Sequence, residues 1–312
     1  MKQAITMSKT ASMTVDGAFE LFIRKCKVKN LSENSINSYW QKTIIFKDFV
    51  GHETDISTIT ENTVDDYILY LRDNTKANEI TVNSYLRSVR AFLYYCMECN
   101  YLERFVVHLT KVEKKIKETY TDDELERLLA RPDIGKCSFT EFKTWVFENY
   151  LLATGNRLTS ALNVRIQDIN FNDGLITIRK TKNRRQQILP LSNTLSGILM
   201  EYLEIRGGTG EEYLFCNVYG EKGSTRTFQQ LVQNYNIKRN VNKTSCHLFR
   251  HTFAKQWILA GGDVFRLQKI LGHSDLTVTK EYVAMFGNDL SMDFEKFNPL
   301  DNLKNKSNTI KM

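Results

Sequence analysis

Residues 246 to 254 read CHLFRHTFA and hold two of the chain's five histidines. His247, Arg250 and His251 lie three and four residues apart, so on a helix they point roughly the same way. Phe249 falls on a different stripe and is expected to pack inward. The stretch therefore predicts a helix that presents two imidazoles and a guanidinium on one face.

A phosphate suits this face better than a metal ion. Zinc proteases also space two histidines by four residues, but they place a glutamate directly after the first, where this chain has Leu248. The permanent charge of Arg250 would also repel a metal ion. An arginine instead binds phosphate oxygens in pairs through its planar fork. We therefore expect a phosphate site and no metal.

A second arginine candidate lies upstream, in LLATGNRLTSALNV. Gly155 can end the preceding helix and Asn156 can cap the next one. Arg157 then comes at a helix N-terminus, where backbone N–H groups already favour an anion. Taken by itself, a surface arginine after a turn would explain the same pattern.

Two further stretches offer a proton donor and a nucleophile. Residues 179 to 185 read RKTKNRR and form a basic turn between expected strands at 175–180 and 186–190. Such a turn can deliver an ammonium group to a leaving oxygen, although most basic turns are simply solvated. Tyr282 falls two turns into a short helix after Gly272, and most tyrosines merely pack.

Composition narrows the class of protein. The chain has 312 residues, a net charge of +7 and a pI near 8.9, which is a weak hint of a nucleic-acid partner. No apolar run reaches the roughly 18 residues of a membrane span, and we expect a cytoplasmic protein with no membrane association. Cys96 and Cys99 form an isolated C-x-x-C among apolar residues and are expected to be free thiols.

Apolar stripes at helical spacing predict a mainly α protein with a small β-hairpin, an α+β fold. Early helices are expected at 13–29, 61–73 and 79–99, with Ser32 capping another. Thr121 and Glu124 have capping-box spacing, so a second set of helices begins there. The expected division is a helical domain at 1–110, a charged linker at 111–120, a second domain at 121–298 and a polar tail at 299–312.

Three stretches resemble the tyrosine recombinases, also called the phage integrase family. They read LATGNRLTSALNVRIQDI, ITIRKTKNRRQQILPL and HLFRHTFAKQWILAGGDVFRLQKILGHSDLTVTKEY. The matched order is Arg, Lys, His-x-x-Arg, Leu-Gly-His and Tyr, with His273 nine residues before Tyr282. The chain departs from the family pattern at Ser160, where many relatives have an acidic residue. The helical first domain is similar to the family's core-binding domain, so the resemblance implies a DNA-binding domain at 1–110 and a catalytic domain at 121–298.

The resemblance implies six catalytic residues: Arg157, Lys182, His247, Arg250, His273 and Tyr282. The arginines and these two histidines would bind the scissile phosphate, with His247 rather than His273 as the proton-transfer partner. The tyrosine would attack the phosphate, and the lysine would protonate the leaving oxygen. Lys180 fits the lysine's place nearly as well as Lys182. His251 commonly follows the second arginine in the family and is expected to be structural.

The implied function is site-specific recombination, in which DNA strands are cut and rejoined through a 3′-phosphotyrosyl intermediate without a cofactor. The expected partners are double-stranded DNA, a homotetramer assembled on it, and accessory DNA-bending or directionality proteins. A mobile element is the expected source. The segment after Tyr282, with Phe286, Phe294 and Phe297, is expected to dock on a neighbouring protomer. A relaxing enzyme of the type IB topoisomerase kind and a catalytically silent DNA-binding protein remain as alternatives.

Overall fold

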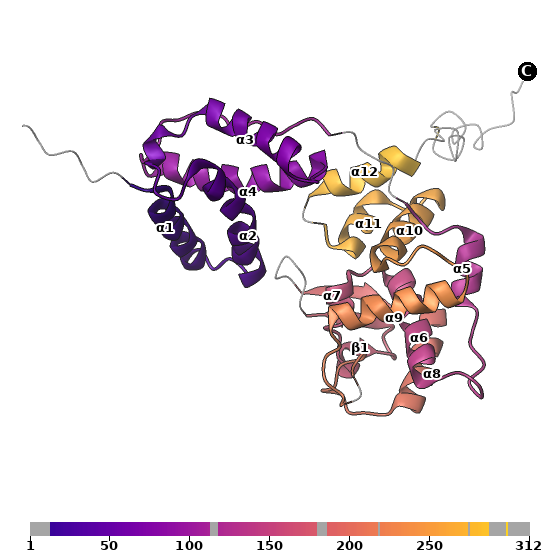
Figure 1. Ribbon diagram of the computed structural model, residues 1–312. Coiled ribbons are helices and arrows are strands. Elements are labelled where there is room, and N and C mark those ends of the chain that lie inside the picture. The colour runs from indigo at the N-terminus through magenta and orange to yellow at the C-terminus, as the bar shows by residue number, and fades with distance from the viewer. Residues whose placement is uncertain are drawn as a thin grey trace, which may run out of the picture. The chain divides into compact units, whose positions relative to one another are not determined.

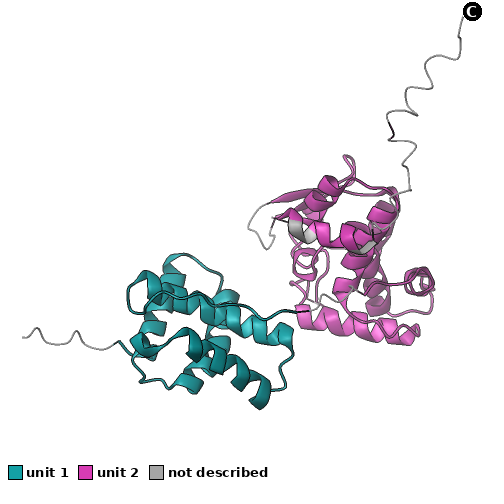
Figure 2. Ribbon diagram, turned by 90° about the horizontal axis from the view of Figure 1, so that it is seen from above, with its two compact units in different colours: residues 1–115 teal, residues 116–312 magenta. Residues whose placement is uncertain are grey.

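The computed structural model describes residues 13–112, 118–179, 186–217, 219–273, 275–286 and 298. The chain folds as two units, Met1–Lys115 and Ile116–Met312, each with its own apolar core (Figure 2). Lys182 and its alternative Lys180 lie outside the described residues, as does segment 299–312.

The first unit is helical. It comprises α1 (Val15–Val28), α2 (Glu33–Val50), the 3-10 turn η1 (Ile56–Thr58), α3 (Glu61–Asn74) and α4 (Glu79–Glu98) (Figure 1). Each α-helix follows a residue whose side chain accepts a bond from a backbone N–H of the first turn: Thr14, Ser32, Thr60 and Asn78. The expected helices and the Ser32 cap are confirmed.

Aromatic side chains fill the core of this unit. Helix α2 packs against α1, α3 and α4, and α1 packs against α4. Phe19 and Phe92 are fully buried and meet edge to face at 5.4 Å, while Phe46 meets Tyr67 in the same way at 5.0 Å. The apolar stripes of the sequence thus converge on one core.

Helix α6 (Phe139–Thr154) is the centre of the second unit. It packs against α5 (Asp122–Leu129), α8 (Asn193–Arg206), α9 (Thr225–Lys238) and α10 (Cys246–Leu259) (Figure 1). Trp145, Val146 and Phe147 are all buried although they follow one another, since neighbours cover α6 on several sides. The capping box of Thr121 and Glu124 begins α5, as expected.

A small antiparallel sheet lies beside these helices. Its strands β1 (Ile169–Asn170), β2 (Leu175–Ile178) and β3 (Gln187–Pro190) are ordered β1-β2-β3, and Ile176 is opposite both Ile169 and Leu189. The expected hairpin and the mainly α fold with a small sheet are confirmed. Strand β2 ends earlier than the expected 175–180, and β1 was not predicted because two residues show no alternation.

The remaining elements are α7 (Leu158–Ala161), the 3-10 turn η2 (Ile166–Asp168), α11 (Val264–Leu271) and α12 (Leu276–Phe286). The helix expected after Gly155 is short and ends at Ala161. Asn156 does not cap it, because its amide donates to the Tyr150 hydroxyl at 2.9 Å, and Arg157 takes the N-cap position. Among the described helices, none combines the length and apolar character that spanning a bilayer requires.

Candidate active site

Helix α10 carries the opening motif and is held at its start. Ser245 is its N-cap, and its hydroxyl accepts a bond from the His247 N–H at 3.3 Å. Phe249 is fully buried against the ring of Tyr120, with ring centroids 4.6 Å apart. The Tyr120 N–H also donates to Thr252 Oγ1 at 2.9 Å. The inward stripe predicted from the sequence is therefore in place, and it fixes the opposite face.

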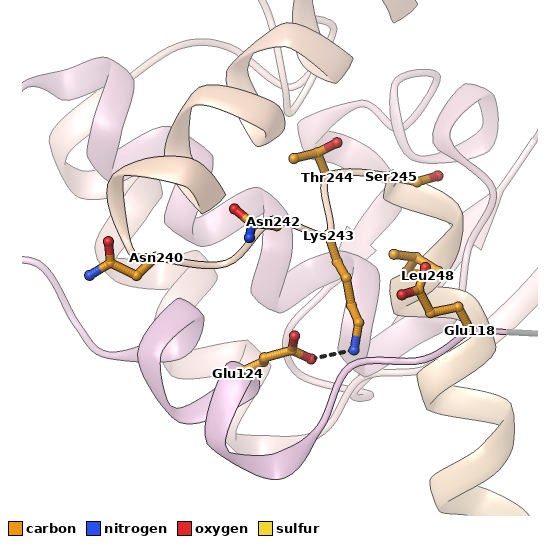
Figure 3. Close-up of a pocket in the computed structure, with 8 residues that line it drawn as sticks. All are labelled: Glu118, Glu124, Asn240, Asn242, Lys243, Thr244, Ser245 and Leu248. Atoms are coloured by element: carbon orange, nitrogen blue, oxygen red, sulfur yellow. Dashed lines mark hydrogen bonds and ion pairs between the residues drawn. The ribbon is translucent and has the colours of Figure 1, made fainter.

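A polar hollow of about 520 Å³ lies at the foot of α10 (Figure 3). Lys243 extends beside it, with Nζ 2.8 Å from Glu124 Oε2 and 2.9 Å from the Thr119 carbonyl oxygen. These contacts join the loop before α10 to the start of α5. The lysine side chain is engaged in holding the loop that leads to His247.

Arg250 is buried and makes three polar contacts. Nη1 donates to the Gly155 carbonyl at 2.9 Å, and Nη2 donates to the Leu271 carbonyl at 2.8 Å and approaches His273 Nε2 at 2.6 Å. Burial, together with the positive charge of Arg157, lowers the pKa of Arg250 to about 10, so the group stays charged at neutral pH. Its plane is fixed by partners from two other segments.

Arg157 comes close enough to Arg250 for each charge to act on the same neighbours. It is half-buried at the N-cap of α7, and burial lowers its pKa. Arg250 and Arg157 both lower the pKa of His247, after the larger effect of burial. Two guanidinium groups 93 positions apart in the chain (157 and 250) therefore create one positively charged region.

Tyr282 points into that region from α12. Its side chain is 2 % exposed, and burial raises the pKa of its hydroxyl, while the charges of Arg250 and Arg157 act in the opposite direction. The ring stacks parallel to that of His273, with centroids 6.3 Å apart. Packing of α12 on α10 and α11 brings the phenol to the arginines.

The two remaining histidines of the predicted set differ in exposure. His273 is half-buried, and its Nδ1 lies 2.9 Å from the hydroxyl of Thr279, which is fully buried. His247 is more exposed to solvent than His273, but the partial burial of its imidazole beside the two arginines lowers its pKa and favours the neutral form at pH 7. An imidazole in that state can accept a proton or donate one hydrogen bond.

The structure thus brings together five of the six predicted side chains: Arg157, His247, Arg250, His273 and Tyr282. The sixth, Lys182, lies in segment 180–185, outside the described residues. Both ends of that segment are fastened. Arg179 forms an ion pair with the buried carboxylate of Asp168, and Gln187 Nε2 donates to the carbonyls of Lys269 and Ile270 at 2.5 and 2.7 Å.

Two contacts of the site were not predicted from the sequence. His251, expected to be structural, places Nδ1 2.7 Å from the hydroxyl of Tyr282. Gln187 ties β3 to the end of α11, next to Gly272. The helical spacing predicted that His251 lies near Arg250. It gave no signal for the hydrogen bond between His251 and Tyr282, which are 31 residues apart in the chain.

This arrangement suits transfer of a phosphoryl group to a phenol. Two fixed guanidinium groups can bind the oxygens of a phosphodiester and stabilise the negative charge that grows on them during attack. Tyr282 supplies a nucleophilic oxygen next to them, and the imidazoles can accept or donate protons near neutral pH.

Known proteins share this fold and these motifs. Residues 118–288 match the phage integrase family and residues 19–103 match its N-terminal SAM-like domain. The tyrosine recombinase XerD of Staphylococcus epidermidis is 26% identical over 282 residues, which cover 87% of this chain and 94% of the relative.

Solved structures agree on the fold. An integrase of the Tn1549 transposon, in complex with a circular intermediate DNA, has a TM-score of 0.70 at 20% identity, covering 87% of this chain and 95% of that one. A lambda integrase tetramer bound to a Holliday junction has a TM-score of 0.69 at 15% identity, covering 89% and 80%.

The first match spans more than half of the chain, so the chain belongs to the phage integrase family, the tyrosine recombinases. It is an enzyme of site-specific DNA recombination and binds DNA.

Proposed function

We propose that this enzyme cuts a DNA strand by attack of Tyr282 Oη on a backbone phosphate that Arg157 and Arg250 hold. The attack leaves a 3′-phosphotyrosyl bond and a free 5′ hydroxyl. The observation that carries the proposal is the meeting of two distant arginines and a buried tyrosine hydroxyl in one positively charged site.

Each arginine has a distinct part in stabilising the transition state. Arg250 is locked by three contacts, so its charge needs no reorganisation when the phosphate arrives. Arg157 is less buried and stands at a helix start, where it can follow the phosphate into place. Removal of one such donor typically costs about 3 kcal/mol of transition-state stabilisation. His247 and His273 add hydrogen bonds to the same oxygens.

We assign the proton for the leaving 5′ oxygen to Lys182 on the hairpin, with Lys180 as the alternative. A 5′ alkoxide is a poor leaving group and needs a proton from a group within hydrogen-bond reach. The contacts of Arg179 and Gln187, on either side of the segment, support this assignment, because Gln187 binds the end of α11 and the next carbonyl there, that of Leu271, binds Arg250.

No cofactor enters the proposed reaction, because one phosphodiester is exchanged for another and the bond energy is kept. A 5′ hydroxyl from a partner strand reverses the step and joins a new pair of ends. Exchange between two duplexes needs four sites, which is why we propose a homotetramer on DNA, helped by DNA-bending or directionality proteins. The lambda integrase tetramer on a Holliday junction supports this assembly.

The domain roles, the location and the source of the enzyme are part of the same proposal. We propose that residues 1–110 form a DNA-binding domain, 121–298 the catalytic domain, and 299–312 a tail. We also propose a cytoplasmic enzyme of a mobile element, to which the likeness to a transposon integrase lends support.

The test is capture of a covalent complex. The purified full chain is incubated with a library of nicked duplexes that carry a randomised core, and DNA that stays attached to denatured protein is sequenced. We expect one enriched sequence, protein linked through a 3′ phosphate, and complete loss of capture in Tyr282→Phe. Capture that persists in Tyr282→Phe, or no capture by the unsubstituted chain, would contradict the proposal.

A further inference from the structure

The hydroxyl of Tyr282 has a hydrogen-bond partner that the implied catalytic set does not include. His251 Nδ1 lies 2.7 Å from Tyr282 Oη, and the two ring centroids are 5.7 Å apart with an interplanar angle of 47°. His251 is half-buried on the face of α10 that also carries Arg250. A contact of this length on the reacting oxygen gives His251 direct access to the phenol proton.

The direction of this hydrogen bond follows from the neighbours of the phenol. Arg157 and Arg250 act on Tyr282 as cations, and a guanidinium offers only donors. His273 is turned to other groups, with Nε2 towards Arg250 and Nδ1 towards Thr279. Because both cations can only donate to the phenol oxygen, we assign the accepting role to the imidazole of His251, with its Nδ1 lone pair facing the phenol O–H.

His247 is less well placed for the same task. It is the first histidine of the motif, but it is more exposed to solvent than His251. Within the described part of the chain, the imidazole bonded to the phenol is that of His251. The position of His247 suits contact with an incoming phosphate instead.

We propose that His251 is the general base that takes the phenol proton of Tyr282 during strand cleavage. The inference rests on the proposed function. As the Oη–H bond breaks, the proton moves to Nδ1 and the Oη–P bond forms. The P–O5′ bond breaks with its electron pair on O5′, which receives a proton from the hairpin acid. In rejoining, the protonated Nδ1 returns its proton to Oη as the 5′ hydroxyl attacks.

Charged and titratable groups lie on every element around this pair: His247, Arg250 and Lys255 on α10, Glu281 on α12, and Arg157 and His273. An arriving phosphodiester adds a negative charge, which stabilises the imidazolium once the proton has moved. The site is therefore arranged for a proton transfer that accompanies attack.

The test uses the duplex sequence recovered by covalent capture, and the rate of covalent complex formation under single-turnover conditions. His251→Asn keeps an oxygen near the position of Nδ1 and so keeps the hydrogen bond, but it cannot hold the proton. We expect a loss of about 100-fold in the cleavage rate, within the usual range of a general base, with unchanged DNA affinity and thermal unfolding. His251→Ala should be similarly slow and should be accelerated by added imidazole.

A second substrate separates the base from the acid. When sulfur replaces the bridging 5′ oxygen, the leaving group departs without a proton. On this duplex the cleavage rate of Lys182→Ala should recover, whereas that of His251→Asn should remain low. The pH profile of His251→Asn should also lack the rising limb that titration of the imidazole gives the unsubstituted enzyme. Glu204→Gln, at an exposed position of α8, is the control and should cleave normally.

The outcomes are distinct. Cleavage by His251→Asn within a few-fold of the unsubstituted rate would overturn the assignment while leaving the proposed function intact. Recovery of His251→Asn on the sulfur substrate would also overturn it, because the residue would then serve the leaving group. If the unsubstituted chain forms no covalent complex, the proposed function itself fails, and the assignment with it.

Discussion

At Gly155 the backbone has φ +60°, and an added Cβ would lie 2.7 Å from Phe253 Cδ1 and 2.9 Å from Leu271 Cδ2. Gly155→Ala should therefore lower the free energy of unfolding by about 1–3 kcal/mol, through overpacking and backbone strain. Urea denaturation measures this change in the free energy of unfolding. Gly197→Ala in α8 is the control, since its methyl meets nothing within 4 Å, and it should raise stability by up to about 1 kcal/mol. Equal midpoints would contradict the packing described.

Glu148 lies fully buried in α6, and neither carboxylate oxygen has a hydrogen-bond partner among the described residues. Burial raises the pKa of this carboxyl well above its ordinary value, and the charge of Arg239 opposes the rise only in part. The folded protein therefore keeps a proton that the unfolded chain releases once the pH passes about 4.5.

It follows that Glu148 makes folding less favourable as pH rises. The stability is fully present below the ordinary pKa of glutamate and is lost progressively above it. Glu148→Gln removes the titration, so we expect a gain of about 1 kcal/mol at pH 8 and a smaller one at pH 5. Thermal unfolding at both pH values measures it. A gain that is the same at both would show that the carboxyl does not titrate in this way.

At the scale of elements, Gln187 joins the start of β3 to the end of α11. Gln187→Leu removes both bonds from β3 to α11, so we expect slower strand cleavage with little change in DNA affinity. Because the hairpin carries the proposed acid, the defect should largely vanish on the duplex with a bridging 5′ sulfur. Gln186→Leu, at the exposed neighbouring position, is the control and should cleave both substrates normally. A Gln187→Leu defect of equal size on both duplexes would mean that the hairpin does not deliver the acid.

The helices and hairpin were predictable because their signals are local. Apolar spacing, the caps at Ser32 and Thr121, and the glycines at 155 and 272 mark their ends within a few residues. The motif residues were found by type and order. The partner of Tyr282, the anchoring by Gln187 and the isolation of Glu148 depend on how distant elements pack, which no local pattern encodes. The prediction that Asn156 caps a helix was wrong, since its amide instead donates to the Tyr150 hydroxyl.

At the scale of the whole molecule, two separate cores predict two unfolding transitions. Phe92 is fully buried in the first core and Phe215 in the second. Phe92→Ala should cost about 3–5 kcal/mol and lower one transition, and Phe215→Ala should lower the other by a similar amount. Differential scanning calorimetry of the full chain measures this. A single transition that both substitutions lower equally would mean that the units unfold together.

Arg250 binds two carbonyls, and both belong to the ends of helices: Gly155 is the C-cap of α6 and Leu271 is the last residue of α11. The same guanidinium that the phosphate requires thus also joins these two helix ends. Local melting of either end, which needs far less energy than global unfolding, would release the arginine from its fixed plane. On warming, the enzyme should therefore lose activity while its cores are still folded. The temperature at which it stops working should depend on the hydrogen bonds of Arg250 to residues 155, 271 and 273.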